Sequence, residues 1–90
     1  MATIKKTRES QYREILSQKG LRLEDCRVLA FTFPSEREAV HFHFAGMRLN
    51  YYIFDGVGET VTIVADPGAV DALTALALKC GGQRRTPSLR

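Results

Sequence analysis

The chain is poor in residues that form cross-links or hold metals. It has two cysteines, two histidines, three prolines and no tryptophan among 90 residues. Cys26 and Cys80 lie far apart and form no CxxC or CxxH motif. We interpret them as small apolar side chains that stay reduced. A disulfide or a shared zinc ion is the less favoured alternative, and no cofactor is expected.

Long apolar runs are also absent. None approaches the roughly 20 residues of a membrane span, and none follows the basic start of the chain as in a secretory signal. We therefore expect a cytoplasmic protein without membrane contact. A composition of 44% hydrophobic and 26% charged residues over 90 positions is typical of one globular domain. We predict an ordered core over residues 7–81, a flexible basic N-terminus over 1–6 and a flexible tail over 82–90.

Motifs of catalysis are missing as well. No serine or cysteine stands in a nucleophile motif such as GxSxG. The carboxylates fall mostly in turns and caps, so they suggest no general acid and base pair. A domain of this size leaves little room for a substrate pocket. The sequence therefore predicts no enzymatic activity, no catalytic residue and no small-molecule substrate.

The patterning that is present predicts an α+β fold. Thr7 or Ser10 can cap a first helix, and Asp66-Pro67 can begin a second one. Between them, β-favouring segments predict strands over residues 27–33, 38–44, 47–54 and 60–65. The expected order is helix, four-stranded antiparallel β-meander, helix (α-β-β-β-β-α). Both helices carry one apolar stripe, so both are expected on one face of the sheet.

Three turn lengths agree on a single apolar face of this meander. They are a two-residue turn at Ala45-Gly46, a three-residue loop over 56–58 and a four-residue loop over 34–37. The predicted inner face comprises Leu29, Phe31, Phe42, Phe44, Leu49, Ile53, Val61 and Ile63, covered by Ile15, Leu16, Leu73 and Leu76. Because the turns agree independently, they favour the meander.

Two histidines on one predicted strand raise the question of a metal site. His41 and His43 would point the same way, as two ligands of zinc or copper do. A third ligand is lacking, because Asn50 binds metals poorly and Arg48 repels a cation. We therefore predict no metal site.

The outer face of the predicted sheet is low in charge and carries aromatic rings. Its candidate binding residues are His41, His43, Arg48, Asn50, Tyr52 and Phe54. Aromatic and arginine side chains with little other charge are typical of interface cores. The first strand, expected at the sheet edge, would add unpaired backbone groups. The sequence thus predicts a small non-enzymatic binding or regulatory protein that docks on a protein partner, or on itself as a homodimer, through this face or an edge strand. The alternative is a merely β-favouring surface.

Basic residues gather near both ends of the chain, which has a net charge of +3. They are Lys5, Lys6, Arg8, Arg13, Arg84 and Arg85. The second hypothesis is a nucleic-acid-binding module in which these residues contact phosphates while Tyr52 and Phe54 stack on bases. The mildly acidic middle of the chain favours the protein-binding hypothesis. Steep salt dependence would separate the two.

Overall fold

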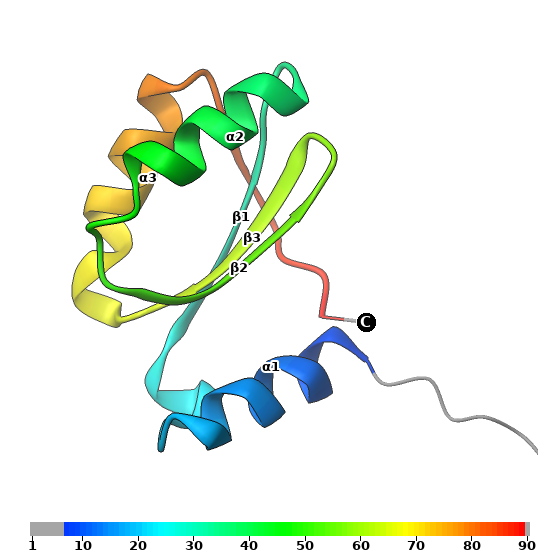
Figure 1. The fold of residues 1–90 in the computed structure, drawn as a ribbon, viewed down its shortest axis with the longest axis vertical. Coiled ribbons are helices and arrows are strands. Elements are labelled where there is room, and N and C mark those ends of the chain that lie inside the picture. Colours follow the sequence, from blue (N-terminus) through cyan, green and yellow to red (C-terminus); the bar gives the residue numbers. More distant parts are fainter. Residues whose placement is uncertain (1–6, 90) are drawn as a thin grey trace, which may run out of the picture.

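The structure is a computed structural model that describes residues 7–89 and has an α+β fold (Figure 1). Its elements are α1 (Arg8–Gln18), β1 (Arg27–Thr32), α2 (Glu36–Ala45), β2 (Tyr51–Val57), β3 (Thr60–Ala65), α3 (Val70–Lys79) and β4 (Gln83–Arg85). Short 3-10 turns at Leu23–Asp25 and Pro67–Ala69 precede β1 and α3. Lys5, Lys6 and the expected flexible N-terminus lie outside the described residues.

The four strands form one antiparallel sheet in the order β2-β3-β1-β4. The predicted α+β class and four-stranded antiparallel sheet are confirmed, but the meander order is wrong. β1 lies between β3 and β4, so it is not an edge strand. The β2–β3 turn consists of Gly58 and Glu59, because Val57 pairs with Thr60. Gly58 has a φ of +61°, which a residue without a Cβ adopts at low cost.

The sheet carries helices on both faces, with α2 and α3 on one side and α1 on the other (Figure 1). The prediction that the first and last helices share one face is therefore wrong. The reason lies in β3, where five consecutive residues are buried. Val61 and Ile63 pack with Phe42 in the core between the sheet and the helices α2 and α3, which we call the α2 and α3 cluster, whereas Val64 packs with Leu16 in the core beneath α1, which we call the α1 cluster. A strand that is apolar on both sides requires cover on both sides.

The segment predicted as a second strand, residues 38–44, is helix α2 instead. Ser35 occupies its N-cap position, and Gly46, whose N–H donates to the Phe42 carbonyl oxygen at 2.9 Å in the last helical hydrogen bond, occupies its C-cap position. Ala39 and Phe42, three residues apart, are the buried residues of this helix. The alternation of apolar residues over 40–44 fits a strand equally well, because a short apolar run does not separate the two periods.

The C-terminal segment is also more structured than expected. The sequence predicts a flexible tail over residues 82–90, yet Gln83–Arg85 pair with β1 as the fourth strand. Further on, the Leu89 carbonyl oxygen accepts a hydrogen bond from the Glu9 N–H at 2.9 Å, and the Leu89 side chain packs against the α1 cluster. β4 is held in the sheet by its backbone hydrogen bonds to β1, and its three side chains are exposed. Its sequence therefore needs no apolar pattern, and none predicts the strand.

Tyr12 links α1 to the sheet. Its side chain is 2% exposed, and its hydroxyl donates to Asp55 Oδ2 on β2 at 2.6 Å. Burial and the neighbouring carboxylate raise the pKa of Tyr12 to about 12. The same carboxylate is thereby held on the α1 side of β2.

The Tyr12→Phe variant tests this link. It removes a hydrogen bond to a carboxylate, so we expect the free energy of unfolding to fall by about 1–3 kcal/mol at neutral pH. Because the pKa of Tyr12 is raised on folding, its contribution is complete below pH 10 and is lost as pH rises toward 12. Urea titrations from pH 8 to 12 should therefore show a steeper loss of stability in the wild type than in the variant. Equal losses would contradict the assignment.

Candidate functional site

The residues predicted to form one binding face do not lie together. His41 and His43 are on α2, Arg48 and Asn50 follow that helix, and Tyr52 and Phe54 are on β2. The pairing of β2 with β3 shifts register between Tyr51 and Ile53. As a result Tyr52 packs with the α1 cluster, whereas Phe54 packs with the α2 and α3 cluster. The expected platform of two adjacent rings is therefore not formed.

The two histidines also separate. Residues two apart on a helix point about 200° from each other. His41 is exposed beside α3, where it lines a hollow with Leu76. The His43 ring centroid instead lies 4.2 Å from the ring centroid of Phe54. The prediction that both imidazoles point the same way is wrong. No group of three histidine, cysteine or acidic side chains within residues 7–89 is placed to hold a metal ion.

The two cysteines lie in different layers. Cys26 is buried in the α1 cluster, and Cys80 packs at the border of the α2 and α3 cluster. Both are free thiols. Burial raises the pKa of the Cys26 thiol, which keeps it protonated at neutral pH. The cysteines thus act as the apolar side chains that the sequence predicts.

The sheet face expected to be exposed is covered by α1. Ala30, Thr62 and Val64 on this face are all buried. A partner cannot reach them without displacing α1, which is held there by Tyr12 and Leu16.

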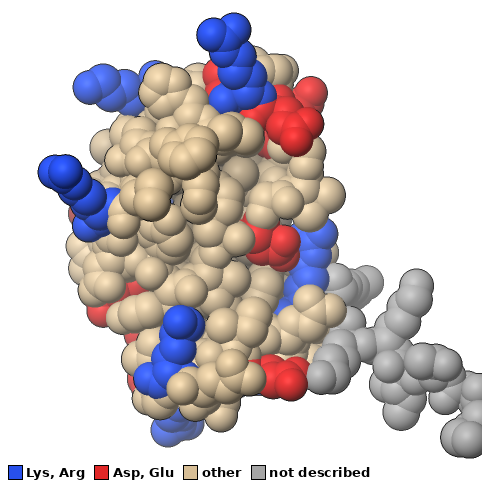
Figure 2. Space-filling view, viewed as in Figure 1, with Lys and Arg blue, Asp and Glu red and all other residues tan. Residues whose placement is uncertain are grey.

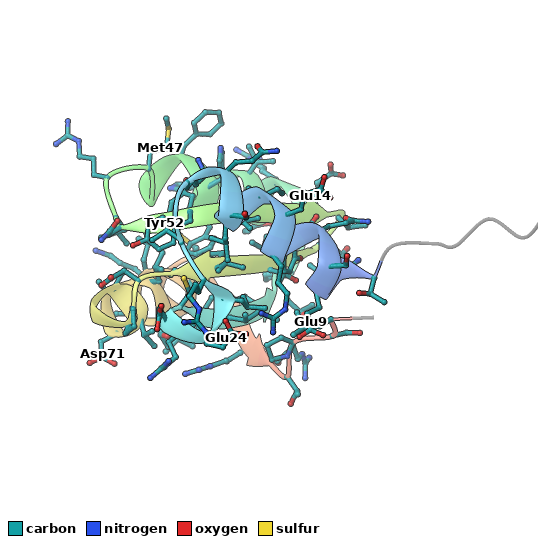
Figure 3. The ribbon with its side chains drawn as sticks, turned by 90° about the horizontal axis from the view of Figure 1, so that it is seen from below. Glu9, Glu14, Glu24, Met47, Tyr52 and Asp71 are labelled. Carbon is teal, nitrogen blue, oxygen red and sulfur yellow. The ribbon has the colours of Figure 1, made fainter. Side chains whose placement is uncertain are left out.

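Large exposed apolar side chains gather on α2 and the turn that follows it. Val40, Phe44 and Met47 are 47%, 64% and 61% exposed. Val40 and Phe44 are four residues apart, so they share one face of the helix. This face lies beside the buried one, because Ala39 and Phe42 point into the core. Figure 3 shows Met47 projecting outward at the rim of the molecule.

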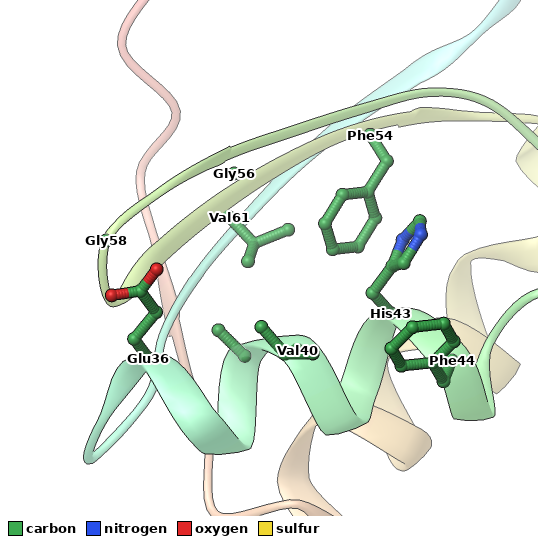
Figure 4. A pocket seen from close by; sticks show the side chains of 9 residues that line it. Glu36, Val40, His43, Phe44, Phe54, Gly56, Gly58 and Val61 are labelled. Atoms are coloured by element: carbon green, nitrogen blue, oxygen red, sulfur yellow. The ribbon is translucent and has the colours of Figure 1, made fainter.

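A groove of about 400 Å³ lies between α2 and the β2–β3 hairpin (Figure 4). Its lining residues are Glu36, Ala39, Val40, His43, Phe44, Phe54, Gly56, Gly58 and Val61. Phe54 and Val61 make the hairpin side apolar. Glu36 stands at one end and His43 at the other, and Nδ1 of His43 is buried without a hydrogen-bond partner in the described part of the chain. The groove can therefore receive an apolar side chain.

The edge of β2 completes this region. Within residues 7–89, β2 has only β3 beside it in the sheet, so alternate backbone N–H and C=O groups face away from the sheet. Natural edge strands are commonly blunted by lysine or proline. β2 has neither, and its one charged side chain, Asp55, is bonded to Tyr12. We call the edge of β2 together with Val40, Phe44 and Met47 the α2–β2 surface.

Among the basic residues that the structure describes, Arg13 lies in ion pairs on α1, and two arginines lie on β4. Arg13 is bonded to Glu9 at 3.0 Å and also to Glu24, whose pKa this contact lowers. Arg84 and Arg85 lie exposed on β4, at the opposite edge from β2. On the face shown in Figure 2, Lys and Arg side chains stand apart from one another. This spacing gives no continuous track for a phosphate backbone on that face.

Comparison with known proteins adds no family to this description: no family model, curated protein or solved structure matches the chain. None of the helices between residues 7 and 89 is long and apolar enough to cross a membrane. The α2–β2 surface itself was missed by sequence reasoning. The Val40 and Phe44 spacing signals it only once residues 36–45 are known to be a helix.

Proposed function

We propose that this chain is a non-enzymatic protein-binding domain that docks its partner on the α2–β2 surface. The observation that carries the proposal is the exposure of Val40, Phe44 and Met47 beside an apolar groove. Large contiguous apolar patches are uncommon on small monomers and, where they occur, mark binding sites. Sequence reasoning also favoured docking on a protein or on a second copy, but through a sheet face that α1 covers or through an edge strand expected at β1, which lies inside the sheet.

The form of the surface suits an extended segment. A strand added to β2 would gain backbone hydrogen bonds, and its alternate side chains would point toward the groove. Phe54 and Val61 offer an apolar contact there, and Phe44 and Val40 form the opposite wall. Specificity would then come from the apolar side chain that the groove receives.

Selection from a random peptide library tests this proposal. Peptides selected on the immobilised wild type should bind with an affinity that falls about tenfold or more in the Phe44→Asp variant, because an aromatic anchor is replaced by a charge. Leu78→Asp is the matched control. Leu78 is 58% exposed and lies on α3, outside the α2–β2 surface, so this variant should bind like the wild type. Equal binding by Phe44→Asp and the wild type would contradict the proposal.

The nucleic-acid hypothesis is tested by a separate binding experiment. A labelled single-stranded oligonucleotide should show no saturable binding at about 50 mM salt. Binding that collapses by about 200 mM salt would instead support contacts between the basic ends and phosphates. That result would replace the proposed function with the second hypothesis.

A further inference from the structure

We infer that the partner of the α2–β2 surface is a second copy of this chain, paired β2 to β2 in antiparallel fashion. This inference rests on the proposed function, because it names the occupant of the same surface. β2 pairs with β3 regularly from Ile53 to Val57 and carries no lysine or proline there, so two copies related by a two-fold axis can join their sheets through this stretch of its edge. Such a dimer would have one continuous sheet of both copies.

The position of α2 fits this arrangement. α2 lies on the β2 side of the sheet, since its residues Val40, His43 and Phe44 share the groove with Phe54 of β2. A two-fold axis through the β2 seam places both copies of α2 on the same face and antiparallel to each other. With the axis near Phe42, Val40 of one copy lies opposite Phe44 of the other.

The charges along α2 are arranged for antiparallel pairing. Glu36, Arg37 and Glu38 occupy the first turn, giving a net negative end, and Arg48 follows the last turn. Arg48 lies in the turn that follows the end of α2 at Ala45. An axis near the middle of α2 therefore brings the acidic first turn of one copy, with Glu36, toward the turn of the other copy that carries Arg48, twice per dimer. A parallel arrangement would place like ends together.

Charge reversal at Glu36 or at Arg48 tests the proposed dimer. Glu36 and Arg48 are both exposed, so the variants Glu36→Arg and Arg48→Glu should remain folded, which circular dichroism checks. By sedimentation equilibrium at about 100 μM, the wild type should be a dimer. Each single variant should dissociate about tenfold more readily, because two attractive contacts become repulsive.

Mixing the two variants is the decisive arm. The Glu36→Arg chain carries arginine at both positions of the pair, and the Arg48→Glu chain carries glutamate at both. Every contact between the two chains is then attractive, so an equal mixture should dimerise within about threefold of the wild-type affinity.

Two results would overturn the inference: a wild type that stays monomeric, or a mixture no tighter than the single variants. If peptide binding by the wild type still depends on Phe44 in that case, the proposed function stands with another partner. If peptide binding does not depend on Phe44 either, both the self-association and the proposed function are wrong.

Discussion

Replacing Phe42 with alanine should lower the free energy of unfolding by about 3–5 kcal/mol. The Phe42 side chain is 1% exposed, and its ring centroid lies 5.2 Å from Phe33, 5.7 Å from Phe31 and 6.1 Å from Phe54. Truncation would leave a cavity bounded by three rings that are themselves fixed by the sheet and cannot all collapse into it. For a domain with a total stability of roughly 5–15 kcal/mol, this is a large loss.

Phe44→Ala is the matched control for that measurement. Phe44 follows Phe42 by two residues on α2 but is 64% exposed. Its truncation should change the free energy of unfolding by less than about 1 kcal/mol in a urea titration. The predicted strand over residues 38–44 would place both rings in the core and make both variants costly. Comparable losses in the free energy of unfolding of the two variants would therefore contradict the assignment of residues 36–45 to helix α2.

The second large effect is expected at Gly82, where the chain turns from α3 into β4. A Cβ added there would lie 2.7 Å from Cε1 of Phe33 and 3.0 Å from the Ala77 carbonyl oxygen. That oxygen also accepts the Gly82 N–H at 2.8 Å, so the backbone cannot retreat without breaking a hydrogen bond. We expect Gly82→Ala to cost about 1–3 kcal/mol through overpacking.

Gly56→Ala provides the comparison. Gly56 is exposed on β2, and an added Cβ would meet only the Phe54 ring at 3.4 Å. Its thermal midpoint should stay close to that of the wild type, since an exposed substitution without a clash changes stability by about 0.5 kcal/mol or less. If Gly82→Ala is as stable as Gly56→Ala, the close packing of Gly82 against Phe33 is not present in solution.

The sequence predicts the central strands well because their pattern is dense and unambiguous. Leu29, Phe31, Val61 and Ile63 share one buried cluster, as predicted. The turn that leads into α3 begins at the expected residues, since Asp66-Pro67 is a strong local signal for a helix start. Local chemistry alone determines these features.

Features that depend on distant contacts were predicted incorrectly. Ile53 packs with the α1 cluster, not with Ile63, because the register of β2 shifts just before it. β4 has no side-chain signal, because only its backbone is used. The Tyr12 hydroxyl reaches Asp55 across 43 sequence positions, and no local pattern announces such a pair. The sheet face expected to be exposed is buried for the same reason, because α1 packs on it from a distant part of the sequence.

Amide hydrogen exchange along β2 tests the central claim most directly. If a second copy pairs with this edge, amides within residues 51–57 should exchange more slowly at about 200 μM protein than at about 1 μM. Amides of β4, at the other edge of the sheet, should exchange at the same rate at both concentrations. Slowing at β4 with β2 unchanged, or no dependence on concentration at either edge, would contradict the assignment of the α2–β2 surface as the interface.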